Sequence, residues 1–448
     1  MKFPEPARLR AFVAEQQTML LASAGSLALR IVGLASTFLL GVVLARALGP
    51  AAYGIYGLVT SLAALAMNVA LLGTPQLAVR EMAIRSARED WPGVRSLAGS
   101  FLRATSLASA TLGIVAIALA FGIGREPRTA ALAFAGAALA ASMSLTALVA
   151  AELRGLGRLL KGQFMDIVAR PAAAFLLTGM ALISGLRLTP AGALWIQVFV
   201  AAIAAGVSLA WLSRTMHPDH SREARTEGMH WLRSAIPLGI VDVLRTFDGA
   251  YGVILVGVLG SAVDLGIYRV AVASAVLVTM PVTILHVVLA PTVSRLHRFG
   301  KRAELQGLLR FASGSMCLVI APMLLVLLLF GRALVQLVFG DVYGDAWLPL
   351  TILCAAQLIL GFFGMGPILL AMADRERHLT LIYVVSVSAG VIAAALLIPL
   401  YGAVGAAAAQ VLSTGLIAIL SGRFARRRLG LGTTFLARAL DPPPGNAD

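Results

Sequence analysis

The stretch 236–268 reads IPLGIVDVLRTFDGAYGVILVGVLGSAVDLGIY. Its middle is apolar and long enough to cross a bilayer, yet it contains Asp242, Arg245 and Asp248. An ionisable side chain in hydrocarbon costs roughly 2.5–3.5 kcal/mol even on the mildest scale. The spacing of i, i+3 and i+6 puts the three side chains on one side of a helix, where each carboxylate can reach the guanidinium. We therefore expect this stripe to face protein or water and not lipid.

The composition places the chain among integral membrane proteins. Of its 448 residues, 59% are hydrophobic and 13% are charged, whereas a soluble domain carries about 25% charged residues. The net charge of +15 does not indicate nucleic-acid binding, because the basic residues flank apolar spans and do not form one surface. Cys317 and Cys354 lie in apolar runs and are expected to be buried thiols. We expect no metal site and no cofactor.

The apolar runs predict twelve spans, each about the 20 residues that a bilayer needs. The predicted spans are 20–46, 53–79, 97–122, 129–151, 168–186, 191–213, 234–260, 265–293, 308–331, 346–371, 379–399 and 402–422.

The basic residues predict the orientation of these spans. One side, which includes the loop 152–170, carries 27 of the 36 Lys and Arg residues, and the other side carries five. This bias predicts that both termini are cytoplasmic. The remaining four, Arg30, Arg103, Arg245 and Arg269, fall within spans, with Arg269 expected to reach the outer interface.

The polar segment 214–233 follows the sixth span and predicts a division of the chain into two six-helix lobes. The lobes cover residues 1–213 and 234–422, with 214–233 as a cytoplasmic linker. Residues 423–448 form a tail whose start is basic. No long loop is predicted on the outer side, which disfavours an enzyme with catalytic groups in an external domain.

An internal repeat supports the two-lobe division. Leu48-Gly49 precedes Gly54-Ile55-Tyr56, and Leu259-Gly260 precedes Gly266-Ile267-Tyr268, at the same place in each half. Because each half has an even number of spans, both halves keep one orientation. The predicted fold is therefore all-α, with two lobes related by a parallel pseudo-twofold axis along the membrane normal, an arrangement found in alternating-access transporters.

The repeat places Arg30 in the first span at about the depth of Asp242 to Arg245 in the seventh. Both halves thus put an arginine into the membrane on their first helix. Arginine stays charged and offers a planar fork of donors that suits phosphate. We expect Arg30 and Arg245 to bind an anionic group, although packing ion pairs or snorkelling of these side chains are alternatives.

Several segments resemble the polysaccharide flippase branch of the multidrug/oligosaccharidyl-lipid/polysaccharide exporter superfamily. They are LARALGPAAYGIYGLV (44–59), LVGVLGSAVDLGIYRVAVA (255–273), LVFGDVYGDAWLPLTILCAAQ (337–357) and LIPLYGAVGAAAAQVLS (397–413). The resemblance implies a flippase of the bacterial inner membrane that moves polyprenyl-diphosphate-linked oligosaccharide to the periplasmic leaflet. It also implies that embedded arginines hold the diphosphate, and that polysaccharide-assembly proteins are possible partners.

Other embedded polar residues carry alternative roles. Asp242 and Asp248 either orient Arg245 or bind a coupling ion, H⁺ or Na⁺, with Asp248 preferred for coupling. Gln357 and Gln410 either bond between helices or contact sugar. A drug/cation antiporter of the same fold is the main rival function, and a membrane glycan polymerase or ligase is a second. The embedded arginines favour an anionic substrate over a cationic one.

Overall fold

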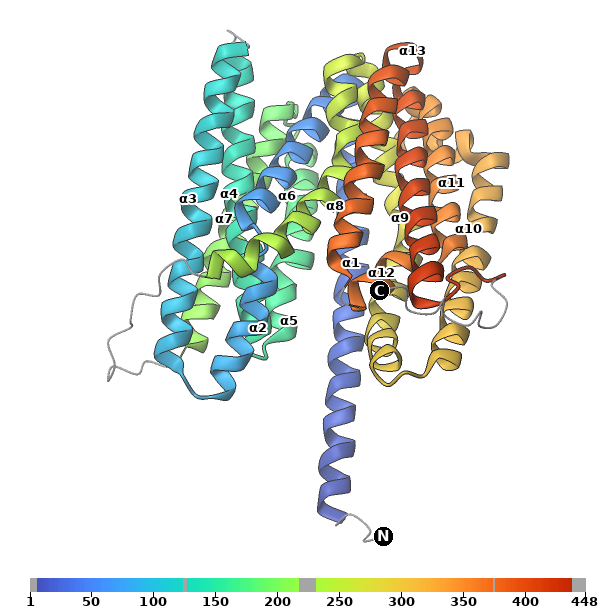
Figure 1. The fold of residues 1–448 in the computed structure, drawn as a ribbon. Coiled ribbons are helices and arrows are strands. Elements are labelled where there is room, and N and C mark those ends of the chain that lie inside the picture. Colours follow the sequence, from blue (N-terminus) through green and yellow to red (C-terminus); the bar gives the residue numbers. More distant parts are fainter. Residues whose placement is uncertain (1–5, 124–126, 217–230, 374, 437–448) are drawn as a thin grey trace. The chain divides into compact units, whose positions relative to one another are not determined.

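A computed structural model describes residues 6–123, 127–216, 231–373 and 375–436 (Figure 1). Within these ranges, side chains are described except at residues 6–24, 123, 127–128, 232–234, 237–238, 286–287, 290–291 and 376. The described residues form helices joined by short turns. Most of the predicted linker, residues 217–230, and the end of the predicted tail, residues 437–448, lie outside the described residues.

The first half of the chain contains α1 (Pro6–Leu71), α2 (Thr74–Ala87), α3 (Trp91–Ile123), α4 (Pro127–Gly155), α5 (Leu159–Gln163), η1 (Phe164–Ala169), α6 (Arg170–Ile183) and α7 (Pro190–Thr215). The second half contains α8 (Leu232–Leu259), α9 (Ala262–Arg298), α10 (Arg302–Phe339), η3 (Asp341–Ala346), α11 (Trp347–Phe363), α12 (Gly366–Met372), α13 (Glu376–Phe424) and η4 (Ala425–Leu429).

These helices confirm the predicted all-α membrane fold of twelve helices in two lobes. Nine helical segments within the described residues are long and apolar enough to cross a membrane. Two of them, in α1 and α13, each contain two predicted spans and bend at a glycine of positive φ, Gly49 and Gly402. Together with α8, the nine segments therefore account for every predicted span.

The second predicted span, 53–79, ends earlier than the sequence suggested. The helix stops at Leu71, and Leu72 and Gly73 take φ values of 43° and 78° before α2 begins. A Cβ on Gly73 would lie 2.2 Å from the carbonyl oxygen of Ala235, so the backbone of α8 comes too close for a side chain. The break follows from this close approach, which hydrophobicity alone does not reveal.

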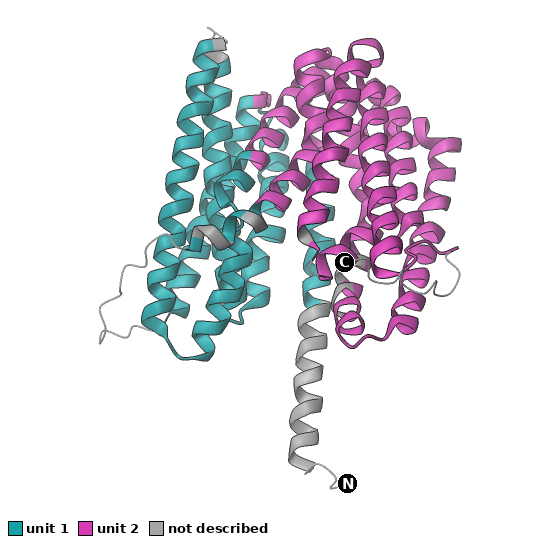
Figure 2. Ribbon diagram, viewed as in Figure 1, with its two compact units in different colours: residues 1–40, 66–186, 191–239 teal, residues 41–65, 187–190, 240–448 magenta. Residues whose placement is uncertain are grey.

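The chain forms two compact units, shown in teal and magenta in Figure 2. The first contains residues 1–40, 66–186 and 191–239, and the second contains residues 41–65, 187–190 and 240–448. In the first unit, Met82 of α2, Phe101 of α3 and Leu148 of α4 share a buried core. The core of the second unit joins α9 through α13 and includes Val293, Leu309 and Leu369, among others.

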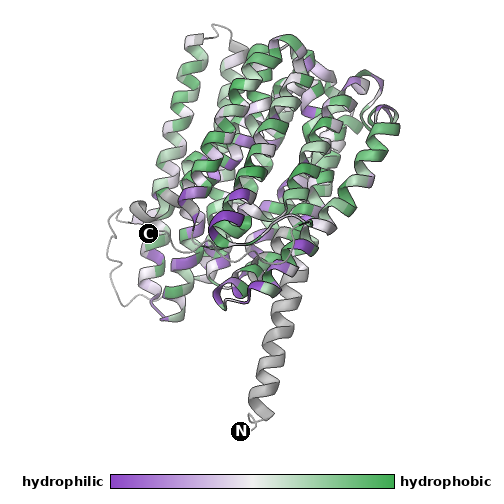
Figure 3. Ribbon diagram, turned by 45° about the vertical axis from the view of Figure 1, so that its right-hand side comes forward, coloured by the Kyte–Doolittle hydropathy of each residue, from purple (hydrophilic) through white to green (hydrophobic). Residues whose placement is uncertain are grey.

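Large apolar side chains remain exposed on individual helices, as in a protein solvated by lipid. Ile114 and Phe121 of α3 are 68% and 62% exposed, and Leu318 of α10 is 76% exposed. Figure 3 shows that long stretches of the helices are hydrophobic, coloured green. Water would oppose this exposure, whereas the hydrocarbon of a bilayer does not.

The repeated Gly-Ile-Tyr motifs pack against each other inside the second unit. A Cβ on Gly266 would lie 2.0 Å from the carbonyl oxygen of Pro50, and a Cβ on Gly54 would lie 3.1 Å from that of Ala262. Gly54 and Gly266, like Pro50 and Ala262, are equivalent positions of the repeat. Each copy therefore offers a glycine to the backbone of the other, as expected where a twofold axis passes.

Arg269 lies three residues beyond Gly266 and packs on Gly57, its own equivalent in the first copy. A Cβ on Gly57 would lie 2.6 Å from Cδ of Arg269, and the Arg269 side chain also interacts with the hydroxyl of Tyr53. The Nε atom of Arg269 is buried. Arg269 thus contributes to the repeat contact.

Candidate functional site

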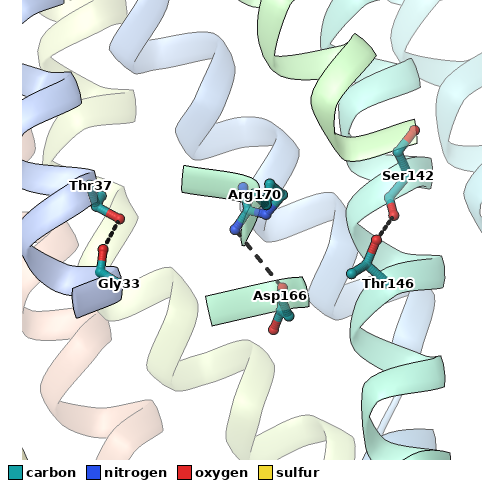
Figure 4. A network of polar contacts seen from close by, with 6 residues as sticks. All are labelled: Gly33, Thr37, Ser142, Thr146, Asp166 and Arg170. Carbon is teal, nitrogen blue, oxygen red and sulfur yellow. Dashed lines mark hydrogen bonds and ion pairs between the residues drawn. The ribbon is translucent and has the colours of Figure 1, made fainter. Parts of the chain in front are cut away.

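Arg30, the arginine predicted from the first span, lies in the first unit beside two further arginines. It is half-buried on α1, and Arg154 of α4 is within electrostatic range of both Arg30 and Asp166. Arg170, at the start of α6, has its Nη2 atom 4.0 Å from Oδ1 of Asp166 (Figure 4). Arg154 and Arg170 therefore lie near the carboxylate of Asp166, and Arg30 lies near Arg154. We call Arg30, Arg154, Arg170 and Asp166 the arginine cluster.

The arginine cluster keeps unused donor capacity. The Nε atoms of Arg30, Arg154 and Arg170 are buried and have no hydrogen-bond partner among the described residues. A buried donor without a partner costs about 1–3 kcal/mol, and more when it is charged. A site with this arrangement gains free energy when an anion with several oxygens enters it.

The local backbone explains how α1 comes close to Asp166. A Cβ on Gly33 would lie 2.1 Å from the carbonyl oxygen of Ile167, so the glycine lets α1 touch η1. Ser26, about two turns before Gly33 on α1, donates from Oγ to Oε1 of Gln163 at 2.7 Å and supports the same contact. The π-helical turn η1 and Pro171 at the start of α6 set the direction of Arg170.

Three members of this cluster, Arg154, Asp166 and Arg170, are not among the site residues that the sequence predicts. The sequence predicts Arg154 and Arg170 in the cytoplasmic loop 152–170, whereas Arg154 lies in α4 and Arg170 begins α6. Both side chains are half-buried. The polar residues Gln163 and Asp166 stand among apolar residues just before the predicted fifth span, 168–186. They were the available signal that this segment packs against the helices.

Glu152 was also missed, because the fourth predicted span ended at residue 151. The helix α4 continues to Gly155, and Glu152 is 0% exposed within it. Neither carboxylate oxygen has a hydrogen-bond partner among the described residues. The embedded groups therefore include this acid in addition to Asp242 and Asp248.

The charged stripe of α8 lies in the second unit from Ile240 onward. Asp248 accepts a hydrogen bond from Oγ of Ser413 on α13 at 2.6 Å, and the amide of Gln410 reaches the same carboxylate. Gln410 also donates weakly to Thr414 at 3.4 Å. The polar face of α13 thus meets Asp248, which places the predicted sugar contact Gln410 beside the predicted coupling residue.

Arg245 is exposed on α8 and interacts electrostatically with Tyr383 of α13. Asp242 and Asp248 each lie about one helical turn from Arg245 on α8. Asp242 is half-buried. Because Arg245 is exposed, a ligand can reach its guanidinium.

Gln357 lies half-buried on α11. Its role in sugar contact stays a prediction, as does that of Gln410. Arg30 belongs to the first unit and Arg245 to the second, so the predicted clamp of two arginines on one diphosphate also stays a prediction. Across the described residues, no group of three or more His, Cys, Asp or Glu side chains forms a metal site.

Residues 22–297 match the family described as polysaccharide biosynthesis protein, and the chain belongs to that family. Among curated proteins, the search found no match. The fold is that of the MOP transporter superfamily. An inward-facing MATE-family multidrug resistance transporter of that superfamily has a TM-score of 0.73 at 14% identity, over 89% of this chain and 97% of its own.

Two further solved structures share the fold. The lipid II flippase MurJ in an inward closed conformation has a TM-score of 0.70 at 14% identity, over 90% of this chain and 86% of its own. A MOP superfamily transporter from Pyrococcus furiosus has a TM-score of 0.57 at 14% identity, over 90% of this chain and 94% of its own. The latter is described as having a binding pocket of reversed polarity that suggests a different function.

Proposed function

We propose that the protein is a flippase that moves a polyprenyl-diphosphate-linked oligosaccharide from the cytoplasmic to the periplasmic leaflet by alternating access. The arginine cluster carries this proposal, because its three guanidinium groups exceed the one carboxylate among them. A diphosphate matches such a site in charge and in number of acceptor oxygens. The family description, polysaccharide biosynthesis protein, agrees with a glycan as the rest of the substrate.

The second unit supplies the other parts of the proposed mechanism. Arg245 meets the same diphosphate when the substrate occupies the transport path. Asp248, held by Ser413 and Gln410, binds the coupling ion, either H⁺ or Na⁺, because a carboxylate among hydroxyl and amide groups suits both ions. The polyprenyl tail remains in lipid throughout transport. The protein therefore needs to enclose only the diphosphate and the sugars.

A cation-coupled drug antiporter is the second candidate, favoured by the acids on the described helices. Glu152 and Asp248 are both embedded, and an acid in such a position attracts cations. The two candidates differ in what the arginine cluster does. In the flippase it binds substrate, whereas in the antiporter it repels substrate and is dispensable or structural.

The proposal is tested by measuring lipid-linked oligosaccharide and surface polysaccharide in cells that lack the protein. We expect lipid-linked oligosaccharide to accumulate in the cytoplasmic leaflet and surface polysaccharide to disappear. Restoring wild type clears the intermediate, whereas Arg154→Gln leaves it in place at equal protein abundance. Arg95→Gln, a change of the same charge on α3, serves as the matched control. Clearance by Arg154→Gln as fast as by wild type contradicts the proposal.

A further inference from the structure

A second basic site in the first unit is lined by residues other than those assigned to transport. A pocket of about 350 Å³ is lined by Arg158 and Lys161 at α5 and by Trp211, Arg214 and Thr215 at the end of α7. Three of its five lining residues are cationic and none is acidic. We call these five residues the basic pocket.

The three cations of the basic pocket are available to a ligand. Arg158, Lys161 and Arg214 are all exposed, and no ion pair within the described residues involves them. Thr215 donates from its hydroxyl to the Trp211 carbonyl at 2.7 Å, which leaves the hydroxyl oxygen able to accept a further hydrogen bond. In the part of the chain that the structure describes, the positive charge of the pocket is therefore not neutralised by an ion pair.

A second pocket shows that unpaired positive charge is not a general property of the pockets in this protein. The hollow of about 630 Å³ beside α10 contains Arg46 and Asp341. The guanidinium of Arg46 there donates to the carbonyl oxygens of Leu337 and Val338. Arg46 thus caps the C-terminal carbonyl groups of α10, as basic residues commonly do at helix ends. Among the described residues, the basic pocket has neither an acidic lining residue nor a backbone carbonyl that accepts from its cations.

The surroundings of the basic pocket indicate that its ligand comes from lipid. Trp211 brings an indole, which settles at the headgroup level of a membrane. Leu160 and Phe164 flank Lys161 on the chain and are 44% and 40% exposed, so they offer apolar contact beside the charges. The sequence places both contributing segments on the cytoplasmic side. Basic pockets between membrane helices on that side bind anionic lipid headgroups.

We propose that the basic pocket binds the phosphate of an anionic phospholipid of the cytoplasmic leaflet. The three cations hold the phosphate, Thr215 adds a hydrogen bond, and the acyl chains lie along Leu160 and Phe164. The bound lipid links α5 to α7 within the first unit. This inference stands apart from the proposed function, because lipid binding is measured without transport.

The test uses the full-length protein in neutral detergent, with native mass spectrometry of bound lipid. The probes are phosphatidylglycerol and phosphatidylcholine with identical acyl chains. We expect wild type to prefer phosphatidylglycerol, and the triple variant Arg158→Gln, Lys161→Gln, Arg214→Gln to lose about 100-fold of this affinity, at roughly fivefold for each cation. The triple Arg295→Gln, Arg298→Gln, Arg302→Gln removes the same charge from exposed positions of α9 and α10 and should retain the affinity.

Two further arms keep the test decisive. Arg214→Gln alone should lose about fivefold and covers the case in which the triple variant fails to fold. Glycerophosphoglycerol, which carries the phosphate without acyl chains, should compete poorly. Equal affinity of the pocket and control variants for phosphatidylglycerol overturns the proposal. Equally tight binding of glycerophosphoglycerol overturns the assignment to lipid and identifies a site for free phosphate esters.

Discussion

Gly266→Ala is the substitution that most directly tests the contact between the two copies of the repeat. The new Cβ would lie 2.0 Å from the carbonyl oxygen and 2.5 Å from the carbonyl carbon of Pro50. Ordinary contacts of this kind are 3.4–4 Å long, so the helices must separate by more than an ångström. The obstacle is backbone and not a side chain that can rotate away.

The expected cost follows from these distances. Forcing one extra carbon into a packed contact costs about 1–3 kcal/mol, and a backbone obstacle puts this case at the upper end. Alanine recovers up to about 1 kcal/mol through its better helix propensity. We therefore expect Gly266→Ala to lower the free energy of unfolding by about 1–2 kcal/mol. Gly307→Ala is the control, because a Cβ at Gly307 on α10 meets nothing within 4 Å.

The assay is unfolding of the purified protein by sodium dodecyl sulfate in mixed micelles, followed by circular dichroism. Gly266→Ala should unfold at a lower detergent fraction than wild type, and Gly307→Ala at an equal or higher one. Gly54→Ala should show a smaller loss than Gly266→Ala, because its nearest backbone atom, N of Gly266, is 2.8 Å away. If Gly266→Ala unfolds together with Gly307→Ala, the repeat contact described above is wrong.

Three further substitutions test the site. Arg245→Ala should insert normally and lose tenfold or more of transport, since a charged hydrogen bond contributes about 1.5–3 kcal/mol; full complementation contradicts its role. Asp248→Asn should make transport insensitive to an imposed H⁺ or Na⁺ gradient, and an unchanged response would remove Asp248 from coupling. Glu152→Leu should raise the free energy of unfolding by about 1–3 kcal/mol in the same detergent assay, because it replaces a buried carboxylate that lacks partners; a loss would mean that Glu152 has an unseen partner.

The sequence was sufficient to predict the helical fold because its signals are local. A bilayer needs about 20 apolar residues per span, and the composition of each run shows this directly. The repeat was also visible, because Gly54 and Gly266 are required by close approach of one backbone to another. The end of α1 at Leu71 was missed, because the cause lies on α8, far away in sequence.

The candidate site was predicted in part. Arg30 and Arg245 were identified because a charge inside an apolar run is costly and conspicuous. Arg154 and Arg170 were missed because they stand at span ends, where a basic residue normally faces the cytoplasm. Their burial depends on the packing of η1 against α1 at Gly33, and a single sequence does not reveal such packing.

Transport by the purified protein in proteoliposomes tests the central claim most directly. One set of vesicles carries a fluorescent polyprenyl-diphosphate-linked oligosaccharide, and a parallel set contains a cationic dye that MATE-type antiporters would move. We predict that the protein flips the glycolipid across the bilayer and that Arg30→Ala, Arg154→Ala and Arg170→Ala together abolish this flipping. We predict no transport of the dye. The account would be contradicted if the wild-type protein transported the dye and did not flip the glycolipid, and if the triple variant still transported the dye.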